Sequence, residues 1–250
     1  MRFLAALQFL TIIPLPRRLK ISAEDSGRSA GYFPVIGLII GLILVGFNWI
    51  FILILPPAVV NALLIVALVV ISGALHLDGF VDTCDGLAIN KDVEERWKVM
   101  HDSRAGSFGI VGVVLLLLLK YVLLNSIPTS TMMITLIIMP VVSRWAMVYA
   151  IFAYPYARPS GLGKAFKQGT TWPRLTMATL IALVVTVALA QLIGLAIIFL
   201  VWVMTLVMAI YFKARFSGLT GDTYGAINEA AEVGVLILVA ILVHLGLAPI

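Results

Sequence analysis

Charged residues are scarce in this sequence, and their scarcity already excludes several classes of protein. Of the 250 residues, 12% are charged and 62% are hydrophobic, and the mean hydropathy is +1.12. A soluble domain typically has about 25% charged and about 45–50% apolar residues. One globular core of this length cannot bury so much apolar surface. The composition therefore argues against a soluble enzyme, a disordered chain and a nucleic-acid-binding module, and it favours an integral membrane protein.

Cysteine is nearly absent as well. The chain has one cysteine, Cys84, which excludes an intrachain disulfide. It lies among aspartates without a pattern that would activate its thiolate, so we interpret it as a packing residue.

Long apolar runs are what the sequence has instead. A crossing takes about 20 residues of helix. The run 175–212 is too long for one crossing, so we place a reversal at Gln191 and Gly194, whereas the stretch 2–16 is too short and indicates an interfacial helix. We expect an all-α integral membrane protein, a single domain of residues 1–250 with about seven transmembrane helices in one bundle. The predicted spans are 33–54, 58–77, 107–125, 131–153, 175–190, 194–212 and 233–249.

Charge is missing altogether from one side of this predicted bundle. The connections at 55–57, 126–130 and around residue 191 contain no Asp, Glu, Lys or Arg. All twelve acidic residues lie on the other side, with all seventeen basic residues except Lys120 and Arg144, which fall inside spans. The positive-inside rule makes the charged side cytoplasmic. We expect a plasma (inner) membrane protein whose N-terminus and active site are cytoplasmic and whose C-terminus is outside.

Three aspartates with helical spacing form the most informative motif. Asp78, Asp82 and Asp85 occupy positions i, i+4 and i+7, directly after the second predicted span, so a helix places them on one face. Three unpaired carboxylates repel one another, and a divalent cation that prefers oxygen ligands, such as Mg²⁺, would relieve this repulsion. Gly79 and Gly86 leave room for a phosphate. The alternative is a solvated acidic helix end, which the absence of interleaved lysine disfavours.

Two further polar segments adjoin spans. Asp102 and Arg104 precede the third span beside a glycine-containing helix start, a combination that suits phosphate, although an ordinary interfacial cap is the alternative. Asp222 and Glu229 are seven residues apart before the last span. They are interpreted as completing a metal shell or acting as a base, with a capped helix as the alternative.

Four basic or histidine side chains are candidates for binding an anionic substrate. Lys120 and Arg144 lie inside spans, where ionisable residues usually mark function, although Lys120 could instead extend toward the interface. His76 precedes the aspartate motif, and Lys164 lies in a basic, glycine-containing loop that would cover a phosphate or anchor to lipid headgroups.

Carboxylates, arginines and glycine-rich helix starts on one membrane face indicate phosphoryl or nucleotidyl transfer with Mg²⁺. The pattern is similar in style to that of the CDP-alcohol phosphotransferases. Another membrane phosphotransferase of that type is one alternative. An ion-coupled transporter is a less favoured one, because the other face carries no polar groups.

The sequence resembles the cobalamin synthase family (adenosylcobinamide-GDP ribazoletransferase) from residue 4 to about 235. Residues 73–86 carry most of the resemblance. The segments 7–16, 101–106, 161–163 and 220–223 also match, and the matches follow one another along the chain in the order found in the family. It implies that adenosylcobinamide-GDP and α-ribazole, or its 5′-phosphate, give adenosylcobalamin, or its phosphate, and GMP with Mg²⁺. His101 is a departure, because arginine is expected there in some relatives.

The resemblance also implies roles for individual residues. Partners would be the two substrates and the bilayer, not nucleic acid, and a homo-oligomer is possible. The metal ligands would be Asp78, Asp82 and Asp85; the catalytic residues Asp82, Asp102, Asp222 and Glu229; and the substrate-binding residues His76, Arg104, Lys120, Arg144 and Lys164.

Overall fold

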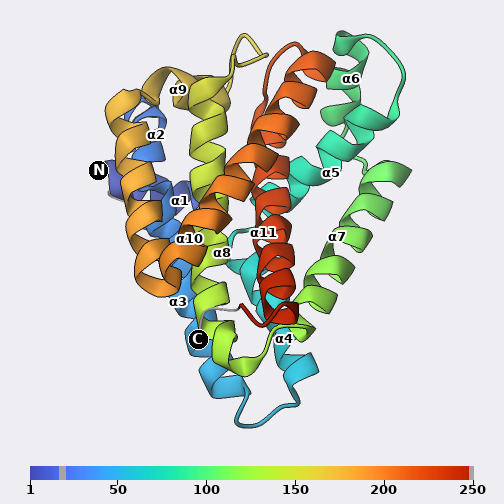
Figure 1. Cartoon of the computed structure of the whole chain (residues 1–250). Coiled ribbons are helices and arrows are strands. Elements are labelled where there is room, and N and C mark those ends of the chain that lie inside the picture. Colours follow the sequence, from blue (N-terminus) through green and yellow to red (C-terminus); the bar gives the residue numbers. More distant parts are fainter. Residues whose placement is uncertain (17–20, 248–250) are drawn as a thin grey trace.

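The computed structural model describes residues 1–16 and 21–247, and within them the chain forms helices and no strand (Figure 1). The longer helices are η1 (Ala30–Tyr32) continued by α3 (Phe33–Phe51), α7 (Ser107–Asn125), α8 (Thr129–Ala153), α10 (Trp172–Phe216) and α11 (Gly221–His244). The shorter ones are α1 (Arg2–Leu10), α2 (Ala23–Gly27), α4 (Pro57–Ile71), α5 (Leu75–Ala88), α6 (Val93–Met100) and α9 (Leu162–Gly169). The all-α membrane fold is thereby confirmed. The end of the last predicted span lies outside the described residues.

Five of these helices are long and apolar enough to cross a membrane, and α4 with α5 makes a sixth crossing if the bent pair counts as one. Helix α10 is two helices joined at Gln191, whose φ of 50° and ψ of −131° are not helical. The chain reverses direction there, as the contact between Gly194 and Thr186 shows. A Cβ on Gly194 would collide with the carbonyl of Thr186, whereas two residues eight positions apart in a straight helix are about 12 Å apart. The predicted split is confirmed. Counting α10 as two crossings gives six, or the seven predicted crossings if α4 and α5 together also count as one.

The second predicted span, 58–77, is wrong at its C-terminal end. Helix α4 stops at Ile71, and α5 leaves it at 89°. Gly73 and Ala74 make the bend with φ of +61° and +55°, values that only glycine adopts easily. The N–H of Ile12 donates to the carbonyl of Ile71 over 2.8 Å, so the N-terminal segment supports the bend. The aspartates therefore lie on a helix of their own rather than continuing a span.

Helix α1 has nine residues, about 14 Å of helix, so it is too short to cross a bilayer, as predicted. It ends at Leu10 and buries Ala5, Ala6 and Leu10 against the bundle. Its interfacial position stays a prediction.

The two ends of the bundle differ in the same way as the connections in the sequence. Figure 1 shows the uncharged turns from α3 to α4 and from α7 to α8 at the end that also holds the C-terminus, and α6 and α9 at the opposite end. The charged connections thus gather at one end of the molecule.

Helices α3 and α8 pack against each other over a long contact at the centre of the core. A Cβ on Gly37 would collide with the carbonyl of Pro140, and one on Gly41 would lie 2.8 Å from Ile137 Cα.

We expect Gly37→Val to lower the free energy of unfolding by about 1–3 kcal/mol, because the backbones must separate. Thermal unfolding in detergent measures this. Gly46→Val on the same helix is the matched control, since nothing lies within 4 Å of its Cβ position; equal losses from both variants would contradict the prediction.

Candidate active site

A cavity of about 250 Å³ lies at the charged end of the bundle, among α1, α5, α8, α9 and α11. Its polar lining includes Asp78 from α5 and Asp222 from α11. The segment 161–167 was predicted as a basic loop over a phosphate, but this is wrong, because helix α9 begins at Leu162; Leu162, Gly163 and Phe166 of this helix form one wall of the cavity. The cavity is therefore bordered by two of the three polar segments that the sequence singled out.

Two glycines bring the backbones of α5 and α11 into contact beside this cavity. A Cβ on Gly79 of α5 would lie 2.8 Å from Asp222 Cα, and one on Gly225 of α11 would lie 2.9 Å from the carbonyl oxygen of His76. Side chains at either position would push the helices apart. The close approach sets Asp222 beside the helix that carries Asp78 and Asp82.

Asp82 is half-buried and lies within electrostatic range of Asp222, Asp78 and Asp85. The Asp82 carboxylate accepts no hydrogen bond from any residue in the described part of the chain. Asp222 differs, because its Oδ2 accepts a 2.8 Å bond from Nη2 of Arg158. Asp78 and Asp82, two of the three carboxylates of the aspartate motif, thus lie near Asp222.

Arg158 is a site residue that the sequence analysis missed. The N–H of Ala157 donates to the carbonyl of Leu219, and the N–H of Leu219 donates to that of Pro155, each over 2.8 Å. Gly218, with φ of +146°, allows this contact, since a Cβ there would lie 2.9 Å from Ala157 N. The loop after α8 is thereby attached to the start of α11, which places Arg158 beside Asp222. No local sequence signal indicates this pairing.

Helix α11 begins at a capping box, in which Thr220 and Thr223 bond reciprocally to each other's backbone N–H. Asp222 lies in its first turn, where the helix dipole favours a carboxylate. The capped helix, given as the alternative in the sequence analysis, is therefore present, and the Thr220 hydroxyl lies 3.4 Å from Asp222 Oδ2.

No group of three His, Cys, Asp or Glu side chains is close enough to hold a metal ion within residues 1–16 and 21–247. The donor set nevertheless suits Mg²⁺, which usually takes one or two protein carboxylates together with substrate phosphates and waters. Asp78 and Asp222 both line the cavity and supply such carboxylates. The metal itself stays a prediction.

Asp85, the third predicted metal ligand, turns away toward α7. Its Oδ2 accepts from the N–H of Gly106 and its Oδ1 from that of Gly109, each over 2.8 Å. It is 8% exposed and caps the N-terminus of α7. In this arrangement both oxygens already bind backbone donors, and the predicted role as a metal ligand has no support from the contacts.

We expect Asp85→Ala to lower the free energy of unfolding by about 1–3 kcal/mol, because two backbone donors at the start of α7 lose their acceptor. Thermal unfolding of the purified protein in detergent measures the loss. Asp78→Ala on the same helix is the control, since Asp78 is exposed. If Asp78→Ala destabilised the protein as much as Asp85→Ala, the capping role would be refuted.

Asp102 and Arg104 pair with each other on the surface. Arg104 Nη2 lies 3.0 Å from Asp102 Oδ2, and the Arg104 side chain is 87% exposed. The hydrogen bonds from Arg104 lower the pKa of Asp102 to about 2, so this carboxylate is a poor general base near neutral pH. The adjacent His101 is also exposed and contacts the carbonyl of Trp97 through Nδ1.

Lys164 lies on α9, next to the cavity wall. Its Nζ donates to the carbonyl of Pro159 over 2.6 Å, and the residue is exposed. The side chain is therefore available to an anion at the cavity mouth, and its predicted role stays open.

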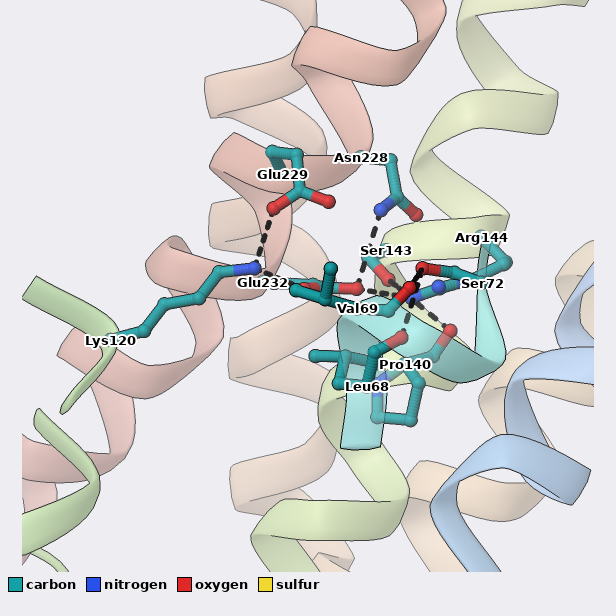
Figure 2. Close-up of polar contacts among 10 residues, drawn as sticks. All are labelled: Leu68, Val69, Ser72, Lys120, Pro140, Ser143, Arg144, Asn228, Glu229 and Glu232. Atoms are coloured by element: carbon teal, nitrogen blue, oxygen red, sulfur yellow. Dashed lines mark hydrogen bonds and ion pairs between the residues drawn. The ribbon is translucent and has the colours of Figure 1, made fainter. Parts of the chain in front are cut away.

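Lys120, Arg144 and Glu229 lie deeper, in a buried ionic network with Glu232 (Figure 2). Lys120 Nζ lies 2.6 Å from Glu229 Oε2 and 2.5 Å from Glu232 Oε2, and Arg144 Nη1 donates to Glu232 Oε1. None of the four is more than 6% exposed. Figure 2 shows Lys120 reaching the α11 carboxylates from one side and Arg144 from the other.

The two cations and two carboxylates of this network balance in charge. None of the four side chains lines the cavity. In this structure they join α7, α8 and α11, and the predicted roles of Lys120 and Arg144 as anion ligands, and of Glu229 as a base, have no contact that supports them.

His76 lies between this network and the cavity. It is 2% exposed, lines the cavity, and lies within electrostatic range of Arg144, Glu232 and Lys120. Neither ring nitrogen has a hydrogen-bond partner among the residues that the structure describes. A buried polar group without a partner is uncommon, and it points to a ligand or a bound water.

Comparison with known proteins identifies the family of this chain. A family model described as Cobalamin-5-phosphate synthase matches residues 2–240. The chain belongs to this family. The resemblance drawn from 73–86 and the other motifs is confirmed, and the match extends over almost the entire chain.

Curated relatives of the cobalamin-5-phosphate synthase family agree with one another. The chain is 39% identical over 231 residues to a protein of Geotalea daltonii named adenosylcobinamide-GDP ribazoletransferase, covering 92% of this chain and 93% of the relative. Proteins with the same name from Desulforamulus reducens and Thermosynechococcus vestitus are 35% and 34% identical over 236 and 245 residues. These alignments cover 94% and 95% of this chain and 94% of each relative. No solved structure matches.

Proposed function

We propose that the protein is an adenosylcobinamide-GDP ribazoletransferase. It joins adenosylcobinamide-GDP to α-ribazole, or to α-ribazole 5′-phosphate, and releases GMP. The observation that carries this proposal is the meeting of Asp78, Asp82 and Asp222 beside a cavity in a member of the cobalamin-5-phosphate synthase family.

The reaction exchanges one P–O bond for another. A ribose hydroxyl of α-ribazole attacks the phosphorus that is bonded to cobinamide, and a new P–O bond forms. The bond from that phosphorus to the bridging oxygen of the GMP moiety breaks, so that GMP leaves. No oxidant or nucleotide energy source is needed, because the diphosphate linkage is already activated.

Asp78 and Asp222 are the residues we assign to hold Mg²⁺, together with oxygens of the substrate diphosphate. The metal, when bound, neutralises charge on the diphosphate and on the departing GMP. Arg158 pairs with Asp222 and orients that carboxylate.

Asp82 is our candidate for the general base that accepts the proton of the attacking hydroxyl. Two of the three carboxylates near it are engaged, Asp85 by backbone donors of α7 and Asp222 by Arg158, and the third, Asp78, is assigned to the metal. Asp82 accepts no bond from the described residues, so it is free to accept one from the substrate.

The site opens to the cytoplasm in this proposal. The charged connections, α6 and α9 gather at the end of the bundle where the cavity lies, as the positive-inside rule requires of the cytoplasmic face. We therefore assign the protein to the plasma membrane with its N-terminus inside and its C-terminus outside.

The test is GMP release by the purified protein in lipid nanodiscs. With Mg²⁺ and adenosylcobinamide-GDP, GMP is expected only when α-ribazole or its 5′-phosphate is added. EDTA is expected to stop the release, and excess Mg²⁺ to restore it. Absence of ribazole-dependent GMP from the untreated protein would refute the proposal. Release of CMP from a CDP-alcohol instead would assign the site to the alternative phosphotransferase class.

A further inference from the structure

We propose that the cavity among α1, α5, α8, α9 and α11 is the binding site for the base and sugar of α-ribazole, an inference that rests on the proposed function. The apolar 5,6-dimethylbenzimidazole base would lie inside the cavity, with the ribose at its mouth. The argument depends on the wall, the size, the unpaired polar groups and the place of the cavity.

The wall of the cavity is mostly apolar and partly aromatic. Its apolar members come from four helices, α1, α5, α8 and α9: Phe9, Leu75, Met147, Ile151, Leu162 and Phe166. Phe9 and Phe166 lie with ring centroids 4.6 Å apart. A flat aromatic base with two methyl groups gains from burial against such a wall.

The size of the cavity excludes the larger substrate. At about 250 Å³, it is slightly smaller than the clefts of roughly 300–1,000 Å³ that enclose drug-sized ligands. A bicyclic base with its sugar is of this order. A corrin macrocycle with its amide side chains is far larger and must remain outside.

Two buried polar groups in the wall have no partner within the described residues. These are both ring nitrogens of His76, which is 2% exposed, and the hydroxyl of Tyr224, which is 3% exposed. Both residues line the cavity. A benzimidazole nucleoside offers one free ring nitrogen as an acceptor and ribose hydroxyls that donate and accept. It would satisfy both side chains.

Guanine, the other base among the substrates, fits this wall poorly. Its edge has several N–H donors and a carbonyl oxygen, and each needs a partner when it leaves water. His76 and Tyr224, the two unpaired polar side chains of the wall, cannot supply them all, and the carboxylates of Asp78 and Asp222 are assigned to the metal. The dimethylbenzimidazole base has one acceptor and no such edge, so the cavity favours it.

The mouth of the cavity lies beside the carboxylates. Asp78 and Asp222 belong to its lining, and Asp82 is one helical turn beyond Asp78. A nucleoside with its base inside therefore presents its ribose toward the group that we assign as base. The nucleophile enters first by this geometry, and the corrinoid diphosphate approaches from the open side.

The test fills the cavity without disturbing the packing. Gly221 lines the cavity, and nothing lies within 4 Å of its Cβ position, so Gly221→Val adds bulk there at little cost to the fold. Gly46→Val, also without neighbours but on the distant helix α3, is the matched control. Tyr224→Phe keeps the ring that stacks on Tyr156 and removes only the unpaired hydroxyl.

Two measurements are made on each variant in nanodiscs. One is binding of α-ribazole alone, followed by the fluorescence of its benzimidazole; the other is the KM for each substrate in GMP release. Gly221→Val is expected to weaken α-ribazole binding and to raise its KM at least about tenfold, while the KM for adenosylcobinamide-GDP changes less than about twofold. Tyr224→Phe is expected to weaken α-ribazole binding about fivefold, the effect of one hydrogen bond.

The possible outcomes separate this inference from the proposed function. If the wild-type protein releases no GMP, the proposed function fails. If it does, and Gly221→Val leaves α-ribazole binding as Gly46→Val does, the cavity assignment fails alone. A rise confined to the KM for adenosylcobinamide-GDP would overturn it by assigning the cavity to the guanosine.

Discussion

Asp82→Asn is expected to lower ribazole-dependent GMP release by about 10³-fold, within the range of about 10²–10⁴ for loss of a general base. The amide keeps the size of the side chain but accepts no proton at neutral pH. Because binding of α-ribazole does not depend on this proton transfer, the loss is expected in kcat rather than in the KM for α-ribazole. Single-turnover GMP release measures it.

The melting temperature of Asp82→Asn is not expected to fall with its activity. The Asp82 carboxylate is half-buried near three like charges, so the neutral amide relieves repulsion, and the melting temperature is expected to stay or to rise. Glu94→Gln is the matched control, since Glu94 is exposed on α6 at the same end of the bundle. It removes the same charge and should keep full activity. A melting temperature that falls together with activity would show that Asp82 holds the fold and not the chemistry.

The apolar runs of the sequence predicted the membrane bundle because lipid permits few other structures. The reversal at Gln191 was also predictable, from the length of the run 175–212. The bend between α4 and α5 was not. Gly73 is its one local signal, and Ala74 adopts a left-handed conformation that alanine gives no reason to expect. The contact from Ile12 that supports the bend is known only from the tertiary structure.

The site was predicted in separate pieces, and the structure determines how they combine. Helical spacing put Asp78, Asp82 and Asp85 on one face of a helix, but two other helices, α11 and α7, pack along different parts of that face. Its first half meets Asp222 of α11, and its last aspartate caps α7. Periodicity within one helix cannot tell which neighbour each residue meets.

The charged residues inside the spans were recognised, but their partners were not. Lys120 is 109 residues from Glu229 and 112 from Glu232, so no local pattern joins them. The sequence analysis interpreted Lys120 and Arg144 as ligands for an anionic substrate, with extension of Lys120 toward the interface as the alternative. The structure adds another interpretation, in which both are members of an internal ion network. The contacts favour the network, and a stability measurement can separate the two.

Glu232→Ala is expected to lower the free energy of unfolding by about 3–5 kcal/mol, because it leaves Arg144 without a carboxylate and Lys120 with only Glu229. Glu232 is fully buried between both cations. Unfolding in mixed detergent micelles, followed by circular dichroism, measures the loss.

The double variant Arg144→Met with Glu232→Gln is the decisive comparison. It removes one charge of each sign and keeps the Lys120–Glu229 pair, so it is expected to recover most of the stability that Glu232→Ala loses. If the loss of stability in the double variant equals the sum of the losses from its two single substitutions, Arg144 and Glu232 do not act as a pair. If Arg144 instead binds substrate phosphate, Arg144→Met alone would raise the KM for adenosylcobinamide-GDP with little loss of stability. If it is a network member, the same variant destabilises the protein, because Glu232 loses one of its two cations deep in the bundle, and the folded fraction keeps its KM.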